Sequence, residues 1–174
     1  MSHLIRLVYA SKATFKTNND SDGAVLDLRI GRILTQSRAN NARRKVGGVL
    51  YYGNGHFFQC LEGDSVTVRA LYDQICTDSR HKDAVILVDE PIETRLFSEW
   101  TMKYIPAEKQ IRSFLLNQGY RHFTPFEFTP EMVTRMVNYL HQVQVNHTVE
   151  SQLQSNTNPN PSLWQKIKAK FHGA

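Results

Sequence analysis

The stretch VLYYGNGHFFQCLEG, from Val49 to Gly63, predicts two strands joined by a tight turn. Gly53-Asn54-Gly55 supplies the residue types that accept the positive φ angles of a hairpin turn. Because side chains alternate along a strand, Gln59 shares one face with the apolar residues two positions away, whereas Phe58 and Cys60 point to the other face. Both faces are mostly apolar, so we expect this strand to be covered on both sides.

Gln59 is the unusual residue of this stretch, because it is a polar side chain in the middle of an apolar strand. A buried amide that lacks hydrogen-bond partners costs about 1–3 kcal/mol. A group on the face that Gln59 shares must therefore offer it hydrogen bonds.

The hairpin is flanked by a repeated pattern of strands and helices. Apolar spacing and turn residues predict strands over 3–9, 46–52, 56–62, 84–88 and 100–105, and helices from 22 to about 38 and from 65 onward. The order βαββαββ is that of an α+β, ferredoxin-like domain with both helices on one sheet face, which we expect over residues 1–105.

The second face of the sheet needs a cover of its own, since Phe58 and Cys60 point toward it. Apolar spacing predicts helices over 110–118 and 129–145, so we expect residues 106–148 to form a C-terminal helical cap on that face. The composition of residues 149–174 predicts a linker followed by a basic, amphipathic tail.

Composition limits the classes of protein to consider. The chain has 174 residues, 41% of them hydrophobic, and a formal net charge of +5, of which three charges come from the lysines of the tail. We therefore expect no nucleic-acid partner. Cys60 and Cys76 lie among apolar neighbours and are interpreted as two buried free thiols. With no signal peptide and no membrane-spanning stretch, the sequence indicates a cytoplasmic protein.

Known enzyme and metal patterns are absent from the sequence. No GxGxxG follows a strand, no serine lies in a nucleophile elbow, and the histidines lack the spacing of zinc ligands. We expect no metal and no catalytic turnover.

Several polar or aromatic residues lie where the sheet and its helices should be plainly apolar. Each has a structural interpretation: Tyr9 as a half-buried strand residue, the Asn40-Asn41 pair as a helix end, and Trp100 as core. Arg80-His81 is either a helix C-terminal pair or a pair of donors for a phosphate.

Together these residues resemble those of the BLUF family, blue-light sensors that bind FAD, and the resemblance extends from Leu4 to about Ile105. The short length resembles the stand-alone type. The motifs that carry the resemblance are LVYAS with Tyr9, RANNAR with Asn40 and Asn41, GVLYYGNGHFFQCLEG with Gln59, DSRHKD with Arg80 and His81, and FSEWTMKY with Trp100 and Met102.

The resemblance implies a flavin between the two helices of the ferredoxin-like domain. It implies that Asn41 holds the C4 carbonyl and N3 side of the ring. The other implied contacts are Asn40, Arg80 and His81 at the pyrimidine edge or phosphates, Ile33 and Ile75 on the ring faces, Phe57 beside Gln59, and Ser11 in support of Tyr9 or the flavin.

The resemblance also implies a photochemical function. Light drives an electron and then a proton from Tyr9 to the flavin, and Gln59 is left in a rearranged hydrogen-bond network. The change passes through Trp100 and Met102 of the last strand to the C-terminal helices.

No output domain is recognised after residue 105, so we expect a separate protein partner, or a change of oligomeric state, to receive the signal. The tail over 162–171 could contact that partner or a membrane surface, or fold back or fray. Two other functions remain as alternatives: a flavin-dependent oxidoreductase, for which no nicotinamide motif is present, and an acylphosphatase-like hydrolase, for which the Gly-Asn-Gly hairpin offers no phosphate cradle.

Overall fold

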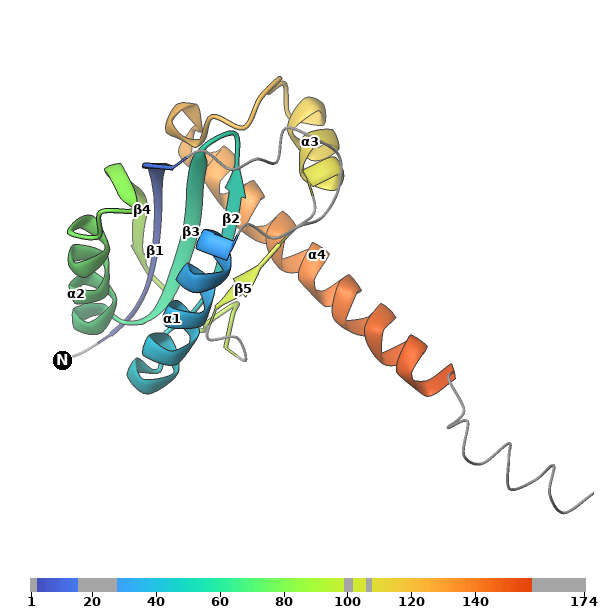
Figure 1. Ribbon diagram of the computed structural model, residues 1–174, viewed down its shortest axis with the longest axis horizontal. Helices are drawn as coiled ribbons and strands as arrows, with labels where there is room; N and C mark the ends of the chain where they lie inside the picture. Colours follow the sequence, from blue (N-terminus) through green and yellow to red (C-terminus); the bar gives the residue numbers. More distant parts are fainter. Residues whose placement is uncertain (1–2, 16–27, 99–101, 106–107, 158–174) are drawn as a thin grey trace, which may run out of the picture. The chain divides into compact units, whose positions relative to one another are not determined.

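The computed structural model describes residues 3–15, 28–98, 102–105 and 108–157 of the chain. Its elements follow the order expected from the sequence (Figure 1). They are β1 (Leu4–Ala13), α1 (Leu28–Arg44), β2 (Gly47–Gly53), β3 (His56–Asp64), α2 (Ser65–Cys76), β4 (His81–Pro91), β5 (Lys103–Tyr104), α3 (Glu108–Asn117), the 3-10 helix η1 (Pro125–Glu127) and α4 (Pro130–Thr157).

The hairpin of β2 and β3 turns through two residues, as the sequence predicts. Asn54 and Gly55 have φ angles of 49° and 73°, and the strands pair with Gly53 opposite His56. Gly48 is needed because β3 passes directly over it: a Cβ there would lie 2.1 Å from the carbonyl oxygen of Cys60. These local requirements fix the register, and the register sets which face Gln59 occupies.

The sheet has the strand order β4-β1-β3-β2-β5. The first four strands are antiparallel, which is the ferredoxin-like arrangement, and β5 lies parallel to β2. Helices α1 and α2 lie on the same side of the sheet (Figure 1). One apolar cluster joins them to β1, β2 and β3; its members include Leu7, Ile30, Ile33, Leu50, Leu61, Val68 and Leu71.

The opposite face is packed with aromatic rings. Phe58 lies 6.5 Å from Phe123 and 6.3 Å from Phe128, and Tyr51 lies 4.8 Å from Phe123, all between ring centroids. The segment that contains η1 therefore covers this face of the hairpin. Residues 1–141 form one compact unit of the chain and residues 142–174 form a second.

Two helix ends differ from the sequence prediction. Helix α1 continues to Arg44 rather than ending near residue 38, because no glycine or proline lies between residue 38 and Lys45, which takes a left-handed φ of 55°. Asn41 therefore lies within the last turn of α1. Helix α4 continues to Thr157, into the predicted linker, because the first proline beyond residue 149 is Pro159.

Other local expectations are revised by the structure. Cys60 is buried but Cys76 is exposed, so the prediction of two buried thiols is wrong for Cys76, the final residue of α2. Arg80 and His81 are not a helix C-terminal pair, since α2 ends at Cys76 and His81 begins β4. Helix α2 begins at Ser65, as predicted, and Asp64 caps it by accepting a hydrogen bond from the Thr67 N–H. None of the helices described is long and apolar enough to span a lipid bilayer.

Candidate functional site

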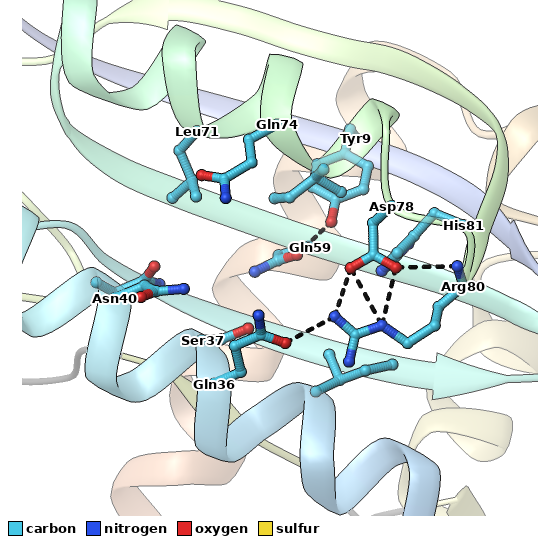
Figure 2. A pocket seen from close by; sticks show the side chains of 13 residues that line it. Tyr9, Gln36, Ser37, Asn40, Gln59, Leu71, Gln74, Asp78, Arg80 and His81 are labelled. Atoms are coloured by element: carbon cyan, nitrogen blue, oxygen red, sulfur yellow. Dashed lines mark hydrogen bonds and ion pairs between the residues drawn. The ribbon is translucent and has the colours of Figure 1, made fainter.

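A pocket opens between α1 and α2, above the centres of β1 and β3 (Figure 2). It contains about 500 Å³ of space not filled by atoms, including solvent at its open mouth. The residues that line it are Tyr9, Ile33, Gln36, Ser37, Asn40, Asn41, Gln59, Leu71, Gln74, Ile75, Asp78, Arg80 and His81.

Tyr9 and Gln59 form the floor of this pocket. They are direct partners in the β1–β3 register, so both side chains project toward the helices from adjacent strands. The Tyr9 hydroxyl donates a hydrogen bond to Gln59 Oε1 (Figure 2). Burial raises the pKa of Tyr9 far above its ordinary value, so the hydroxyl keeps its proton and remains a donor.

Met102 completes the surroundings of Gln59. The Gln59 Nε2 donates to the Met102 Sδ at 3.4 Å, and Met102 is buried. A thioether is a weak acceptor, whereas an amide NH₂ favours a strong one. Gln59 thus has one strong and one weak partner, and rotation of its amide would exchange the groups that face Tyr9 and Met102.

An ion pair stands at the pocket mouth. Arg80 Nε donates to Asp78 Oδ1 at 2.8 Å, and its Nη2 donates to Gln36 Oε1 of α1 at 2.8 Å. The hydrogen bonds from Arg80 lower the pKa of Asp78 to about 2, so this carboxylate is charged at neutral pH. Arg80 therefore lies at the pocket as expected, but with its charge already balanced by Asp78.

His81 lies deeper than a surface phosphate ligand would. Its Nδ1 is 2.8 Å from the Ser11 Oγ, and its ring centroid is 4.6 Å from that of Phe57. Burial lowers the pKa of His81 to about 4, so the imidazole is neutral at neutral pH. Ser11 and Phe57 are buried behind His81 and are not among the residues that line the pocket.

The two asparagines lie in the last turns of α1. Asn41 is almost fully buried and Asn40 is half-buried, with its Oδ1 accepting a hydrogen bond from Arg43 at 2.7 Å. Ile33 from α1 and Ile75 from α2 add apolar walls. Trp100, the remaining site residue named from the sequence, lies outside the described residues.

Sequence reasoning missed five residues of the pocket lining: Gln36, Ser37, Leu71, Gln74 and Asp78. Helical spacing could have found four of them. Gln36 and Ser37 lie one turn from Ile33 and one turn from Asn40 and Asn41, so they share a face of α1. Leu71 lies one turn before Ile75 in α2, and Gln74 lies one turn after Leu71, whereas Asp78 follows the end of α2 at Cys76 and has no such signal.

This donor set fits a flavin. The isoalloxazine ring is flat, with apolar faces and one edge of carbonyl and N–H groups, and the pocket offers isoleucines from both helices together with amides from Asn40, Asn41 and Gln59. Among the described residues, no group of three or more His, Cys, Asp or Glu side chains could hold a metal ion. The fold and the pocket thus define a protein that binds a planar organic cofactor.

Comparison with known proteins identifies the family. Residues 4–103 match the BLUF family, described as sensors of blue light using FAD, and the chain belongs to this family. The chain is thus a blue-light photoreceptor that binds a flavin, and the cofactor of the family is FAD.

Three relatives show the extent of the likeness. The chain is 32% identical over 141 residues to the photoactivated adenylate cyclase subunit beta of Euglena longa, covering 77% of this chain but only 15% of that protein. It is 32% identical over 75 residues to the blue light- and temperature-regulated antirepressor BluF of Escherichia coli, covering 43% of this chain and 19% of the relative. The structure of BlsA in its photo-activated state aligns with a TM-score of 0.70 at 33% identity, covering 79% of this chain and 94% of BlsA.

The share of each relative that is covered differs widely. The likeness to the cyclase subunit is limited to 15% of it, whereas the likeness to BlsA covers 94% of BlsA. The chain thus spans only a small part of the length of the curated cyclases that it matches.

Proposed function

We propose that Tyr9 and Gln59 form the photochemical switch of this receptor. The observation that carries the proposal is the hydrogen bond from the buried Tyr9 hydroxyl to Gln59 Oε1, with Met102 on the other side of the amide. When bound, FAD would supply blue-light absorption and an acceptor for an electron and a proton. Tyr9 gives up both from its hydroxyl and takes them back when the charges recombine.

Gln59 retains the signal after Tyr9 has recovered. Its amide has an oxygen that accepts hydrogen bonds and an NH₂ group that donates them. Rotation exchanges the two, so two hydrogen-bond networks of comparable energy exist around it. We infer that light leaves Gln59 rotated, or in another tautomer, with a stronger hydrogen bond to the flavin carbonyl. Met102, and Trp100 in the same segment, respond to that change.

The remaining pocket residues bind and orient the cofactor in this proposal. Asn41, Asn40 and Arg80 hold its polar groups, and Ile33 and Ile75 flank the ring. The support for these assignments is that all five line the pocket. Ser11 and Phe57 lie behind the lining, where they fix in place the neutral imidazole of His81, which itself lines the pocket.

A route for the signal runs from β3 toward the C-terminal helices. Glu62 lies on the same strand as Gln59; its carboxylate is fully buried, pairs with Arg6 at 2.7 Å, and accepts a hydrogen bond from the Phe97 N–H at 2.9 Å. The Phe97 ring lies 5.7 Å from the ring of His141 in α4. A displacement of β3 would therefore reach α4 through the segment that also leads to Met102.

A separate protein partner would receive this signal, with a change of oligomeric state as the alternative. The support is by analogy: the name of the E. coli relative describes an antirepressor, which is a protein that acts on another protein. No contact in the described residues favours the alternative of a flavin-dependent oxidoreductase, but the experiment below separates it from the sensor.

The test is the absorption spectrum of the purified, flavin-loaded protein before and after blue light. We expect a small, reversible red shift in the parent and none in Tyr9→Phe. The matched control is Tyr72→Phe, because Tyr72 packs against Tyr9 at 5.3 Å but does not line the pocket. A red shift that persists in Tyr9→Phe would contradict the proposal. Bleaching by a hydride donor, with no shift under light, would favour the oxidoreductase.

A further inference from the structure

Helix α1 carries an unusual concentration of positive charge. Its 17 residues and the following Lys45 include six cationic residues and no Asp or Glu. Without these six residues, the formal net charge of +5 on the whole chain would be −1. The positive character of the sequence is therefore local, and the total charge used in the sequence analysis conceals it.

Five of these side chains are exposed: Arg32, Arg38, Arg43, Arg44 and Lys45. We call them the cationic face of α1. Among the residues that the structure describes, no carboxylate forms an ion pair with any of them. A helix surface of one sign, without neutralising partners, attracts an oppositely charged surface.

Three of the five arginine and lysine side chains are held in place by neutral oxygens. Arg38 Nε donates to the Met102 carbonyl at 3.0 Å, Arg43 Nη2 to Asn40 Oδ1 at 2.7 Å, and Arg44 Nη2 to Gln74 Oε1 at 2.9 Å. Each guanidinium group thus has a fixed position and keeps its full charge, which lowers the entropy lost when an anionic group binds.

The acceptors of these bonds belong to the light-sensing site. Asn40 and Gln74 line the pocket, and Met102 is the residue that contacts Gln59. Hydrogen bonds lead from the Tyr9 hydroxyl through Gln59 to the Met102 sulfur, and the backbone carbonyl of the same Met102 accepts a hydrogen bond from Arg38 on the surface. A rearrangement at Gln59 has a short path to the cationic face.

We propose that the cationic face of α1 is the docking surface for an acidic segment of a protein partner, and that Arg38 couples its affinity to the state of Gln59. This inference rests on the proposed function for its dependence on light. A nucleic acid is the less favoured occupant, because α1 contains no aromatic side chain for base stacking and the rest of the chain is net negative.

The first experiment measures binding of a fluorescent 12-residue polyglutamate peptide to the flavin-loaded protein in the dark and under blue light. We expect Arg32→Glu/Lys45→Glu to weaken dark-state binding about tenfold. The matched control Lys109→Glu/Arg112→Glu makes the same change in net charge on α3, and it should weaken binding less than about twofold.

The second variant tests the coupling. In the parent, light should change peptide affinity about fivefold. Arg38→Met should retain the red shift of the flavin but lose this light-dependent difference, because the donor to the Met102 carbonyl is gone. Arg38→Met with an unchanged light-dependent difference would overturn the coupling.

Other outcomes overturn the docking surface itself. Equal losses of peptide affinity in the two double variants would mean that binding depends only on the total charge of the protein. A 20-base-pair duplex that binds the α1 face more tightly than the peptide would replace the protein partner by a nucleic acid, and loss of FAD from Arg32→Glu/Lys45→Glu would assign the face to the cofactor. If the parent shows no red shift, the proposed function fails, but the dark-state comparison still decides whether the surface exists.

Discussion

The two faces of the sheet are built in different ways. On the face toward α1 and α2, the centre is a polar pair, Tyr9 and Gln59, under a pocket. On the other face, the same strands present Phe58 to Phe123 and Phe128, and bury the Arg6–Glu62 ion pair. In the proposed function the polar pair changes its hydrogen bonds, whereas close-packed rings leave no room for a second arrangement. On that proposal one face switches and the other supplies the rigid reference against which it moves.

The largest effect on stability should come from removing a buried ring of the aromatic face. Phe58→Ala should lower the free energy of unfolding by about 3–5 kcal/mol, because the ring is fully buried and its removal leaves a cavity. Urea denaturation measures this. The flavin red shift should survive in the folded fraction, since Phe58 points away from the pocket. A loss below about 1 kcal/mol would mean that this face is not the rigid one.

Removing the buried carboxylate should cost nearly as much. Glu62→Ala leaves Arg6 without its main partner and the Phe97 N–H without its acceptor, so we expect a loss of about 3 kcal/mol in urea denaturation. The control is Asp89→Ala, which breaks the exposed pair with Arg69 and should cost less than about 1 kcal/mol. Equal losses in the two variants would show that burial does not distinguish them.

Acid should reduce the stability contributed by the sheet face that carries the pocket before it affects the aromatic face. Folding lowers the pKa of His81 from its ordinary 6.5 to about 4, so the unfolded chain takes up this proton first. The contribution of neutral His81 to the free energy of unfolding is complete above pH 6.5 and is lost as the pH falls toward 4. The loss reaches up to about 2 kcal/mol, after allowance for the partial exposure of the side chain. The lowered pKa of Asp78 adds a further loss only below about 3.8.

Urea midpoints at pH 7 and pH 5 test this dependence. His81→Gln should flatten the change between the two values, whereas His122→Gln, at an exposed position, should leave it in place. An unchanged slope in His81→Gln would assign the acid sensitivity to another group.

The smallest effect on stability should accompany the largest effect on function. Gln59→Leu removes the amide but fills similar space, so the cost is about 1 kcal/mol from the Tyr9 hydroxyl left without its acceptor. The red shift should nevertheless be lost, as measured by the absorption spectrum under blue light. A variant that keeps its red shift would remove Gln59 from the switch.

Local patterns in the sequence were sufficient for most of the fold. Alternating residues and the Gly-Asn-Gly turn predicted the hairpin and the face of Gln59, and turn residues predicted the order of elements. The end of α1 at Arg44 has a local cause, the left-handed φ of Lys45 after a stretch without helix breakers. The exposure of Cys76 and the position of His81 in β4 instead depend on neighbours distant in the sequence.

By itself, the sequence determined the order of strands and helices along the chain, the residues at the floor of the pocket and, through a resemblance in motif, the flavin. Only the tertiary structure decided that Arg80 is already paired with Asp78, that Met102 contacts Gln59, and that α1 gathers its charges beside the site. The physical reason is the distance along the chain over which each kind of interaction acts. Strand alternation and turn chemistry act between neighbours along the chain, whereas hydrogen-bond partners and local charge density are set by side chains that only folding brings together.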